Sequence, residues 1–546
     1  MSHKLQNPII PGFYPDPSIC RVGEDFYLAC SSFELSPAVP IFHSRDLAHW
    51  EQLGYAIGPE NGFKMDKGSM VGGVMAPTLR WHKGLFYMLN ANFADRGNYI
   101  VTAENPAGPW SMPHYLDDVP GIDASLFFDR DGECYIMGTG DVWDNGAGQM
   151  ERGIRLARYD IENFRMAGEP FTIYNSAMRG AASPESPHLY HIGDYYYLMI
   201  AEGGTEHYHS VVVARSKELF AFYEGCPANP VMTHRQMGFK APIINVGHAD
   251  FVDLPDGSWY AVMLASRLID GKCKNLGRET FICPVVWERD WPLFSPETGR
   301  VEWSYDAPAS LPWTEYPAEA SFDDFDDPKL PLYWNTWGIP KDGVVSLSDS
   351  CAKLKCIRQA LADELEPMFG VEKRDDKYVS ALLRRQRAIH VTATCAMRFV
   401  PEGSESAGMA VVQAMNHQYH LERAVSDGKQ VLRLVLCTAE YPCPPYFPGF
   451  TSQTSLKTVA ETEWNDKNIV LQIELDGEDF TIRYGTNREA LATLCVADGN
   501  LINPEKVGCM AGTTVGIFAS GNGTDSDNTA CFDWFELIEN GGKETL

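Results

Sequence analysis

Asp16-Pro17-Ser18-Ile19, followed by Gly23 and Phe26-Tyr27, is the first of five versions of one pattern in this chain. Each version reads as a β-hairpin, because a short strand, a charged turn with glycine and an aromatic-rich strand follow one another. The later versions begin at Ala76, Asp123, Glu185 and His248. The steps between these first residues are 60, 47, 62 and 63 residues. A self-similar unit of this period is typical of a radial repeat such as a β-propeller.

The repeat also places polar residues at one position in several units. In a propeller the innermost strands surround one axis, so equivalent positions converge although they lie far apart in the sequence. Asp16, Asp123, Glu185 and His248 would then meet in one cleft. This convergence predicts an enzyme.

The rest of the chain has a different sequence pattern, which indicates a second domain. At 546 residues the chain is too long for one ordinary core. A proline-rich connector follows residue 305, and beyond it short alternating strands recur without long helical patterns. We therefore predict an all-β chain: a five-bladed β-propeller catalytic domain over 1–305, a linker over 306–317 and a concanavalin-like β-sandwich accessory domain over 318–546.

The composition limits the class of partner. The formal net charge is −28, which argues against nucleic acid, an anionic membrane or any polyanion as partner. It favours a neutral or cationic ligand without choosing between them. The oligomeric state stays open, and a homo-oligomer is compatible with the sequence.

The N-terminus and the cysteines suggest a compartment. Residues 1–8 contain no apolar segment typical of a secretory signal, so we expect a cytoplasmic protein, although loss of a native signal peptide is an alternative. The 14 cysteines form no C-x-x-C pair, and many lie in strand-like apolar runs, among them Cys20, Cys30 and Cys531. We expect them to be reduced, mostly buried thiols.

The three acidic positions suit glycoside hydrolysis. That reaction needs an acid that protonates the leaving oxygen and a second carboxylate, which in an inverting enzyme activates water. A third carboxylate beside the acid raises its pKa by repulsion. Glu185 is the expected acid, because its side chain is longer and lies between Pro184 and Pro187. Turn or cap roles for the three residues are the alternative.

Further side chains have two interpretations each. His248 contacts substrate, holds a water or metal, or is a structural residue. Arg278 forms forked hydrogen bonds with a carboxylate and sugar hydroxyls, or a surface ion pair with Glu279 or another acid. Phe33 forms a wall for a sugar face, or is a core aromatic. The segment 207–209 has two imidazoles two residues apart, but no third ligand is evident, so a loop is favoured over a metal site.

The chain resembles glycoside hydrolase family 43. The resemblance rests on several stretches of the first domain, and the second domain is similar to the β-sandwich of the family's β-xylosidase and α-L-arabinofuranosidase branch. The matching stretches are 7–18, 40–47, 121–123, 184–189, 200–205 and 277–281.

The resemblance implies an inverting, exo-acting glycosidase with a five-bladed propeller. It implies Asp16 as base, Asp123 as the residue that tunes and orients the acid, Glu185 as acid and Arg278 on the substrate. It implies that chemistry requires no cofactor. It also implies, from parts of the family, a structural calcium ion on the axis that is held largely by water and by one histidine, here His248. Expected substrates are non-reducing xylosyl ends of xylo-oligosaccharides and arabinofuranosyl groups of arabinoxylan, which a bifunctional enzyme would share.

One substrate-binding position departs from the family. Many β-xylosidases of the family carry tryptophan before the Ala-Pro of the second repeat, where this chain has Met75. Loss of an indole there changes the pocket wall and gives arabinofuranosidase activity more weight. A non-catalytic, lectin-like propeller and an endo-arabinanase are the alternative functions. We also expect the sandwich to close one side of the pocket.

Overall fold

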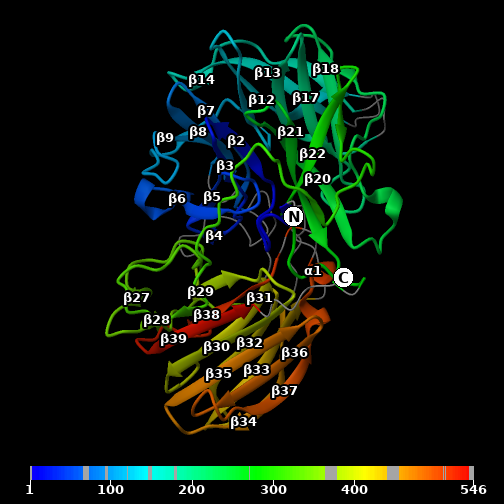
Figure 1. Ribbon diagram of the computed structural model, residues 1–546. Coiled ribbons are helices and arrows are strands. Elements are labelled where there is room, and N and C mark those ends of the chain that lie inside the picture. The colour runs from blue at the N-terminus through cyan, green and yellow to red at the C-terminus, as the bar shows by residue number, and fades with distance from the viewer. Residues whose placement is uncertain are drawn as a thin grey trace.

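The computed structural model describes most of the chain as β-structure in two parts (Figure 1). The described residues are 3–65, 73–92, 96–119, 121–144, 150–176, 181–269, 271–362, 378–439, 454–507, 510 and 512–539. Their helices are single short turns: η1 (Pro59–Asn61), η3 (Arg235–Met237), η4 (Gly499–Ile502) and α1 (Pro504–Val507). Over these ranges, no helix has the length and apolar character needed to cross a bilayer.

The first part consists of five antiparallel sheets that follow one another along the described chain. The first sheet holds β2 (Ser18–Val22), β3 (Asp25–Ala29), β5 (Ala38–Ser44) and β6 (Glu51–Ile57). The second holds β7 (Val74–His82), β8 (Leu85–Asn92), β9 (Gly97–Ala103) and β10 (His114–Tyr115). The third holds β11 (Ser125–Phe128), β12 (Cys134–Asp144), β13 (Met150–Asp160), β14 (Arg165–Met166) and β15 (Phe171–Asn175). The fourth holds β16 (Glu185–Ile192), β17 (Tyr195–Glu202), β18 (Ser210–Ser216) and β19 (Glu224–Gly225). The fifth holds β20 (Ile243–Asp253), β21 (Trp259–Arg267), β22 (Glu279–Glu288) and β23 (Trp291–Phe294).

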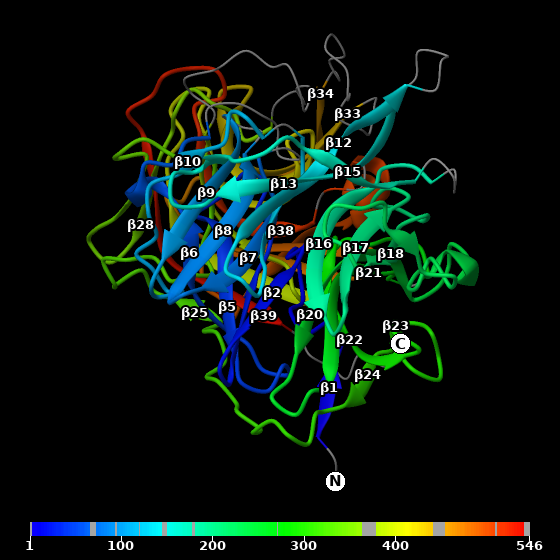
Figure 2. The ribbon, with the colours of Figure 1, turned by 90° about the horizontal axis from the view of Figure 1, so that it is seen from above.

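The five sheets form a closed ring (Figure 2). Each first strand contacts the first strand of the next sheet, in the order β2, β7, β11, β16, β20 and back to β2. The N-terminal segment is bound to the fifth sheet, because the side-chain amide of Asn7 bonds both the N–H and the carbonyl of Ile282 on β22. Near it β1 (Lys4–Gln6) pairs with β24 (Ser304–Asp306). The predicted propeller of β-hairpins is confirmed.

The second part packs two antiparallel sheets face to face around one apolar core. One sheet holds β25 (Phe322–Asp323), β27 (Val345–Leu347), β28 (Ala352–Lys355), β30 (His390–Arg398), β35 (Asn468–Asp476), β36 (Asp479–Gly485), β37 (Ala492–Asp498) and β39 (Thr529–Glu539). The other holds β29 (Ser380–Arg385), β31 (Ser406–Ala414), β32 (His417–Ser426), β33 (Lys429–Ala439), β34 (Thr454–Glu463) and β38 (Thr514–Ser520). Alternate side chains of both sheets point inward, as in a sandwich.

Strand pairing and hydrogen bonds join the two parts next to the N-terminal catalytic candidate. β4 (Leu35–Ser36) of the first part pairs with β26 (Thr336–Trp337) of the second. The Arg385 guanidinium donates through Nε to the carbonyl of Phe13 at 2.9 Å, and this contact is buried. Trp337 donates through Nε1 to Glu34 at 3.0 Å. The sandwich therefore holds the segment that leads into Asp16.

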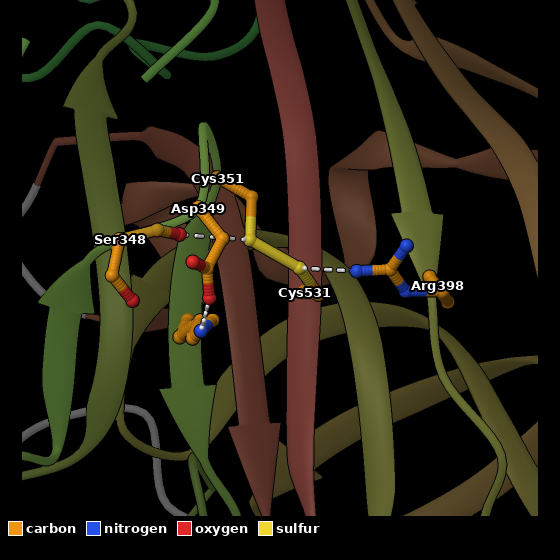
Figure 3. Close-up of a disulfide and its surroundings, with 6 residues drawn as sticks. Ser348, Asp349, Cys351, Arg398 and Cys531 are labelled. Carbon is orange, nitrogen blue, oxygen red and sulfur yellow. Dashed lines mark hydrogen bonds and ion pairs between the residues drawn. A yellow bond between two sulfur atoms is a disulfide. The ribbon is translucent and has the colours of Figure 1, made fainter. Parts of the chain in front are cut away.

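One cysteine expectation is wrong. Cys531, expected to be a reduced buried thiol, forms a disulfide with Cys351 (Figure 3). Cys351 follows the β27 turn and Cys531 lies on β39, so the bridge joins neighbouring segments of one sheet that are 180 residues apart in sequence. Arg398 donates through Nη2 to the Cys531 sulfur at 3.2 Å. The other cysteines of the described ranges are free, and most are buried.

Candidate active site

Each of the five repeats has one residue in the left-handed backbone region at the mouth of the ring. These residues have φ between 49° and 56°, and they are Asp16, Ala76, Asp123, Ser186 and His248. A residue with positive φ turns the chain sharply, and non-glycine residues adopt it where the surrounding structure enforces it. The left-handed residue lies two residues before the inner strand in the first and third repeats, and within the inner strand in the others.

Glu185 does not occupy the position expected from the repeat. In the fourth repeat the left-handed residue is Ser186, so Glu185 lies one residue earlier than Asp16 and Asp123 do in theirs. A β-bulge accompanies this shift: Glu185 pairs with Ala201, and the next pair, His188 with Met199, advances three residues on one strand and two on the other. The assumption of three strictly equivalent acidic positions is therefore wrong.

Met75 has the same offset in the second repeat. It directly precedes left-handed Ala76, and the register again advances by three residues against two, from Met75 paired with Ala91 to Thr78 paired with Leu89. Met75 is thus the positional counterpart of Glu185, and it is half-buried at the start of β7. A role for Met75 in substrate binding stays a prediction.

Asp16 is buried among hydrogen-bond donors. Arg278 donates through Nη1 to Oδ1 at 2.8 Å, and the Ser31 hydroxyl donates to Oδ2 at 2.6 Å. His248 Nδ1 lies 3.7 Å from Oδ1. Burial alone would raise the pKa of Asp16, but the Arg278 charge, with smaller contributions from His248 and the Ser31 hydroxyl, lowers it below its usual value. Asp16 is therefore ionised at neutral pH, as a general base must be.

Arg278 has donors left for a ligand. It is buried and its Nη1 is used by Asp16 and, at 3.3 Å, by the Thr205 hydroxyl. Its Nε and Nη2 find no partner within the described ranges. The alternative ion pair with Glu279 is not formed, because Glu279 binds Arg267 at 2.7 Å instead. Two buried N–H groups without partners are costly unless a ligand accepts their bonds.

Glu185 and Asp123 differ from Asp16, because the pKa values of both are raised. Burial raises the pKa of Glu185 to about 7, and the Asp16 charge adds to this against Arg152 and Arg278. The pKa of Asp123 is raised by burial and by the charges of Glu185 and Asp16. The Ser186 N–H donates to the Asp123 carboxylate. The ring thus brings the three carboxyl groups into electrostatic contact and separates their protonation states.

Phe33 lies beside this cluster. Its ring is buried, stacks on Phe13 at 5.3 Å between centroids, and lies 5.5 Å from the Arg278 guanidinium carbon. A small pocket beside it is lined from both parts of the protein, by Phe13, Ser32, Phe33, Leu35, Gln413, Gly512 and Thr514. The sandwich therefore contributes residues next to Phe33, whereas its closure of one side of the substrate pocket stays a prediction.

The two histidines of the 207–209 segment have different partners. His207 stacks on Phe239 at 3.8 Å, whereas His209 is buried and donates through Nδ1 to the Asn245 carbonyl at 2.9 Å. Burial lowers the pKa of His209 to about 4, so the ring is neutral. The two rings thus have separate partners, and the segment lies in the loop between β17 and β18.

A calcium ion at His248 finds little support from neighbouring side chains. Calcium takes six to eight oxygen ligands. Within the described ranges, no group of three or more histidine, cysteine, aspartate or glutamate side chains could hold a metal. Asp16, the acidic neighbour of His248, already binds Arg278 and Ser31. The described side chains offer no site in which several of them hold the metal, so a calcium ion held largely by water and His248 stays a prediction, and no step below depends on one.

Three residues of the site are absent from the sequence-based set: Ser31, Thr205 and His209. Ser31 also accepts the Ala76 N–H through its hydroxyl at 2.7 Å, so it links the first and second sheets beneath Asp16. Ser31 follows the first hairpin and Thr205 ends the stretch 200–205, so both lie in segments that the repeat had marked. Their roles follow from contacts between sheets, which the sequence does not display.

Comparison with known proteins agrees with this geometry. The family described as glycosyl hydrolases family 43 matches residues 5–292, and the beta xylosidase C-terminal concanavalin A-like domain matches residues 322–537. A xylosidase/arabinosidase of Butyrivibrio fibrisolvens is 39% identical over 98% of this chain and 99% of its own. A non-reducing end alpha-L-arabinofuranosidase of Bacteroides ovatus is 35% identical over 98% of this chain and 94% of its own.

Solved structures show the same two-part architecture. The xylan beta-1,4-xylosidase of Bacillus halodurans superposes with a TM-score of 0.86 at 30% identity, and it covers 98% of this chain and 100% of its own. The chain therefore belongs to glycosyl hydrolase family 43, as its sequence resemblance implied, and it is a glycosidase. Members of the family need no cofactor for catalysis.

Proposed function

We propose that this family 43 glycosidase removes single pentose units from non-reducing ends, acting both on β-1,4-xylosyl ends of xylo-oligosaccharides and on α-L-arabinofuranosyl groups of arabinoxylan fragments. The names of its relatives support both sugars: two full-length relatives are xylosidase/arabinosidases, and a third is an arabinofuranosidase. Met75, in place of the tryptophan expected of many β-xylosidases, supports the arabinofuranosyl activity.

The observation that carries the proposal is the split in protonation between Asp16 and Glu185. Asp16 has a lowered pKa and is ionised, whereas Glu185, with a pKa of about 7, keeps its proton on about half of the molecules at neutral pH. Inverting hydrolysis requires this combination. Asp16 removes a proton from water as the water attacks the anomeric carbon, while Glu185 gives its proton to the leaving oxygen. The products are the inverted sugar and a free hydroxyl on the shortened chain.

Arg278 and Asp123 support this step. The free Nε and Nη2 donors of Arg278 are placed to bind sugar hydroxyls next to the base. Asp123 accepts the Ser186 N–H and lies in electrostatic contact with Glu185, so the two carboxyl groups titrate as a coupled pair next to the ionised Asp16. Phe33 forms an apolar wall beside the sugar, and the sandwich residues around Phe13 limit the length of the glycone site.

The test compares substrates on one preparation. We expect turnover of both nitrophenyl β-xyloside and nitrophenyl α-arabinofuranoside, and release of xylose alone from the non-reducing end of xylotetraose. Proton NMR should show α-xylose as the first anomer formed from a β-xyloside. A first anomer of β configuration would exclude inversion, and oligomeric products would favour an endo-acting enzyme.

A further inference from the structure

A second ring of polar side chains lies one layer below the catalytic groups. In every repeat the residue two positions after the left-handed residue is polar and buried, with an exposed fraction of 3% or less. These residues are Ser18, Thr78, Ser125, His188 and Asp250. Because side chains on a strand alternate, residues i and i+2 face the same side, roughly 7 Å apart along the strand.

Members of this ring bond to neighbouring sheets. Ser18 donates from its hydroxyl to Asp250 Oδ2 at 2.7 Å, which joins the first sheet to the fifth. Thr78 donates to the Ala124 carbonyl at 3.4 Å, which joins the second to the third. Ser125 donates to the Pro187 carbonyl, which joins the third to the fourth. Each bond connects two inner strands that carry or precede catalytic candidates.

Arg80 bonds to the two remaining members of the ring, Asp250 and His188. It donates through Nη1 to Asp250 Oδ2 at 2.9 Å and through Nη2 to His188 Nδ1 at 2.9 Å. It thereby links the second, fourth and fifth sheets. The Tyr190 hydroxyl also donates to Asp250, and the Ile19 N–H reaches the same carboxylate at 3.0 Å. Asp250, on the fifth sheet, is therefore an ionised buried hub for donors from three other sheets, the first, second and fourth.

The state of His188 follows from this contact. Its Nδ1 accepts a bond from a permanent cation, so the proton of the neutral ring is on Nε2. Burial lowers the pKa of His188 to about 3, which keeps the ring neutral. Nε2 has no partner within the described ranges. The contribution of His188 to the ring is therefore its acceptor at Nδ1.

We propose that Ser18, Thr78, Ser125, His188 and Asp250, joined by Arg80, form a positioning layer that sets the mutual spacing of the catalytic groups. Members of the layer are close in sequence to the residues of the site. Ser18 is two residues after Asp16, His188 three after Glu185, and Asp250 two after His248. A shift between inner strands at this layer would be passed directly to the acid and the base. This inference rests on the proposed function, because it assigns the layer a role in that reaction.

The test uses two substitutions of His188, one that keeps an acceptor for the Arg80 guanidinium and one that removes it. Asparagine places its Oδ1 near the former Nδ1 and can accept from Arg80, whereas leucine cannot. We expect His188→Leu to lower kcat on xylotetraose at least about tenfold with KM changed less than about twofold, since about 1 Å of misplacement costs up to 10²-fold. We expect His188→Asn to recover most of kcat.

A second pair of variants, each lacking a single hydroxyl, distinguishes an effect on the layer from a general loss of stability. Tyr190→Phe removes one hydroxyl donor from Asp250, and Tyr223→Phe removes a hydroxyl of the same sheet that donates to the Leu219 carbonyl at 3.1 Å, away from the ring. We expect Tyr190→Phe to lower kcat, and Tyr223→Phe to leave kcat unchanged at a comparable loss of Tm.

The outcomes separate the two proposals. If the wild type hydrolyses the pentosides while His188→Leu and Tyr190→Phe keep its kcat, the layer has only a structural role and the inference is wrong. Equal kcat losses in His188→Asn and His188→Leu would also overturn it. If the wild type neither cleaves the pentosides nor binds xylose or arabinose by calorimetry, the proposed function fails and the inference fails with it.

Discussion

Replacing Glu185 by alanine should separate substrates by the quality of their leaving group. An ordinary glutamate with a pKa of 4.5 would be protonated on about 0.3% of molecules at pH 7, whereas a pKa of about 7 gives about half. The buried site therefore increases the amount of competent acid about 150-fold. A positioned acid contributes about 10²- to 10⁴-fold to the rate where the leaving group needs a proton.

We therefore expect Glu185→Ala to lower kcat on xylobiose by about 10³-fold. With 2,4-dinitrophenyl β-xyloside, whose leaving group departs as a stable anion, the loss should stay below about tenfold. The assay is initial-rate kinetics from pH 4 to 9 on both substrates, with Glu185→Gln as a variant of matched size. Circular dichroism and Tm should confirm that both variants are folded.

The pH profile gives a second readout of the same assignment. Because the raised pKa belongs to the acid, wild-type activity on xylobiose should fall as pH rises through about 7, where Glu185 loses its proton. The base has a lowered pKa, so activity should persist as pH falls until Asp16 is protonated below its usual range. In Glu185→Ala the limb near pH 7 should disappear with the dinitrophenyl substrate. Equal losses on both substrates, or an unchanged alkaline limb, would refute Glu185 as acid.

Three further changes test the surroundings of the site. Asp123→Asn should move the alkaline limb of kcat/KM to lower pH, because one carboxyl group of a coupled pair is removed and the remaining one loses its proton more readily; an unmoved limb would exclude that role. Gly512→Val should raise KM, since a Cβ at Gly512 would meet Phe13 at 2.5 Å and displace it; Gly168→Val, where a Cβ would lie in ordinary contact 3.7 Å from Arg158, is the control, and equal KM values would contradict a sandwich contribution. Cys351→Ser should lower stability by about 2–4 kcal/mol and abolish the effect of dithiothreitol on Tm, whereas a wild-type Tm insensitive to dithiothreitol would argue against the disulfide.

The hairpins were predictable because their signals are local. At all five predicted turns between the first and second strands, glycine has positive φ, as at Gly23 and Gly193. The alternating runs of the second part were also readable, and two of them form β31 (Ser406–Ala414) and β35 (Asn468–Asp476). Such patterns depend on neighbours in sequence, so one chain suffices to read them.

Features that depend on contacts between distant segments were not readable in the same way. The bridge between Cys351 and Cys531 joins strands 180 residues apart, and apolar surroundings alone made both cysteines resemble buried thiols. The shift of Glu185 against the repeat was readable but missed, because Ser186-Pro187 aligns with Asp16-Pro17 and Ala76-Pro77 and leaves Glu185 one residue earlier. Ser31 as a donor to Asp16 depends on how the strands of the ring meet.

The bulge at Glu185 also offers a physical reason for the division of labour between the carboxylates. Asp16 occupies the left-handed position itself and is 4% exposed, where a guanidinium and a hydroxyl donate to it at 2.8 and 2.6 Å. Glu185 lies one residue before that position and is half-buried, and within the described ranges no ion pair holds it. A carboxylate with fixed donors is stabilised as the anion, whereas one buried without a close cation keeps its proton. One repeated backbone turn, used in two registers, therefore suffices to produce a base on one blade and an acid on another.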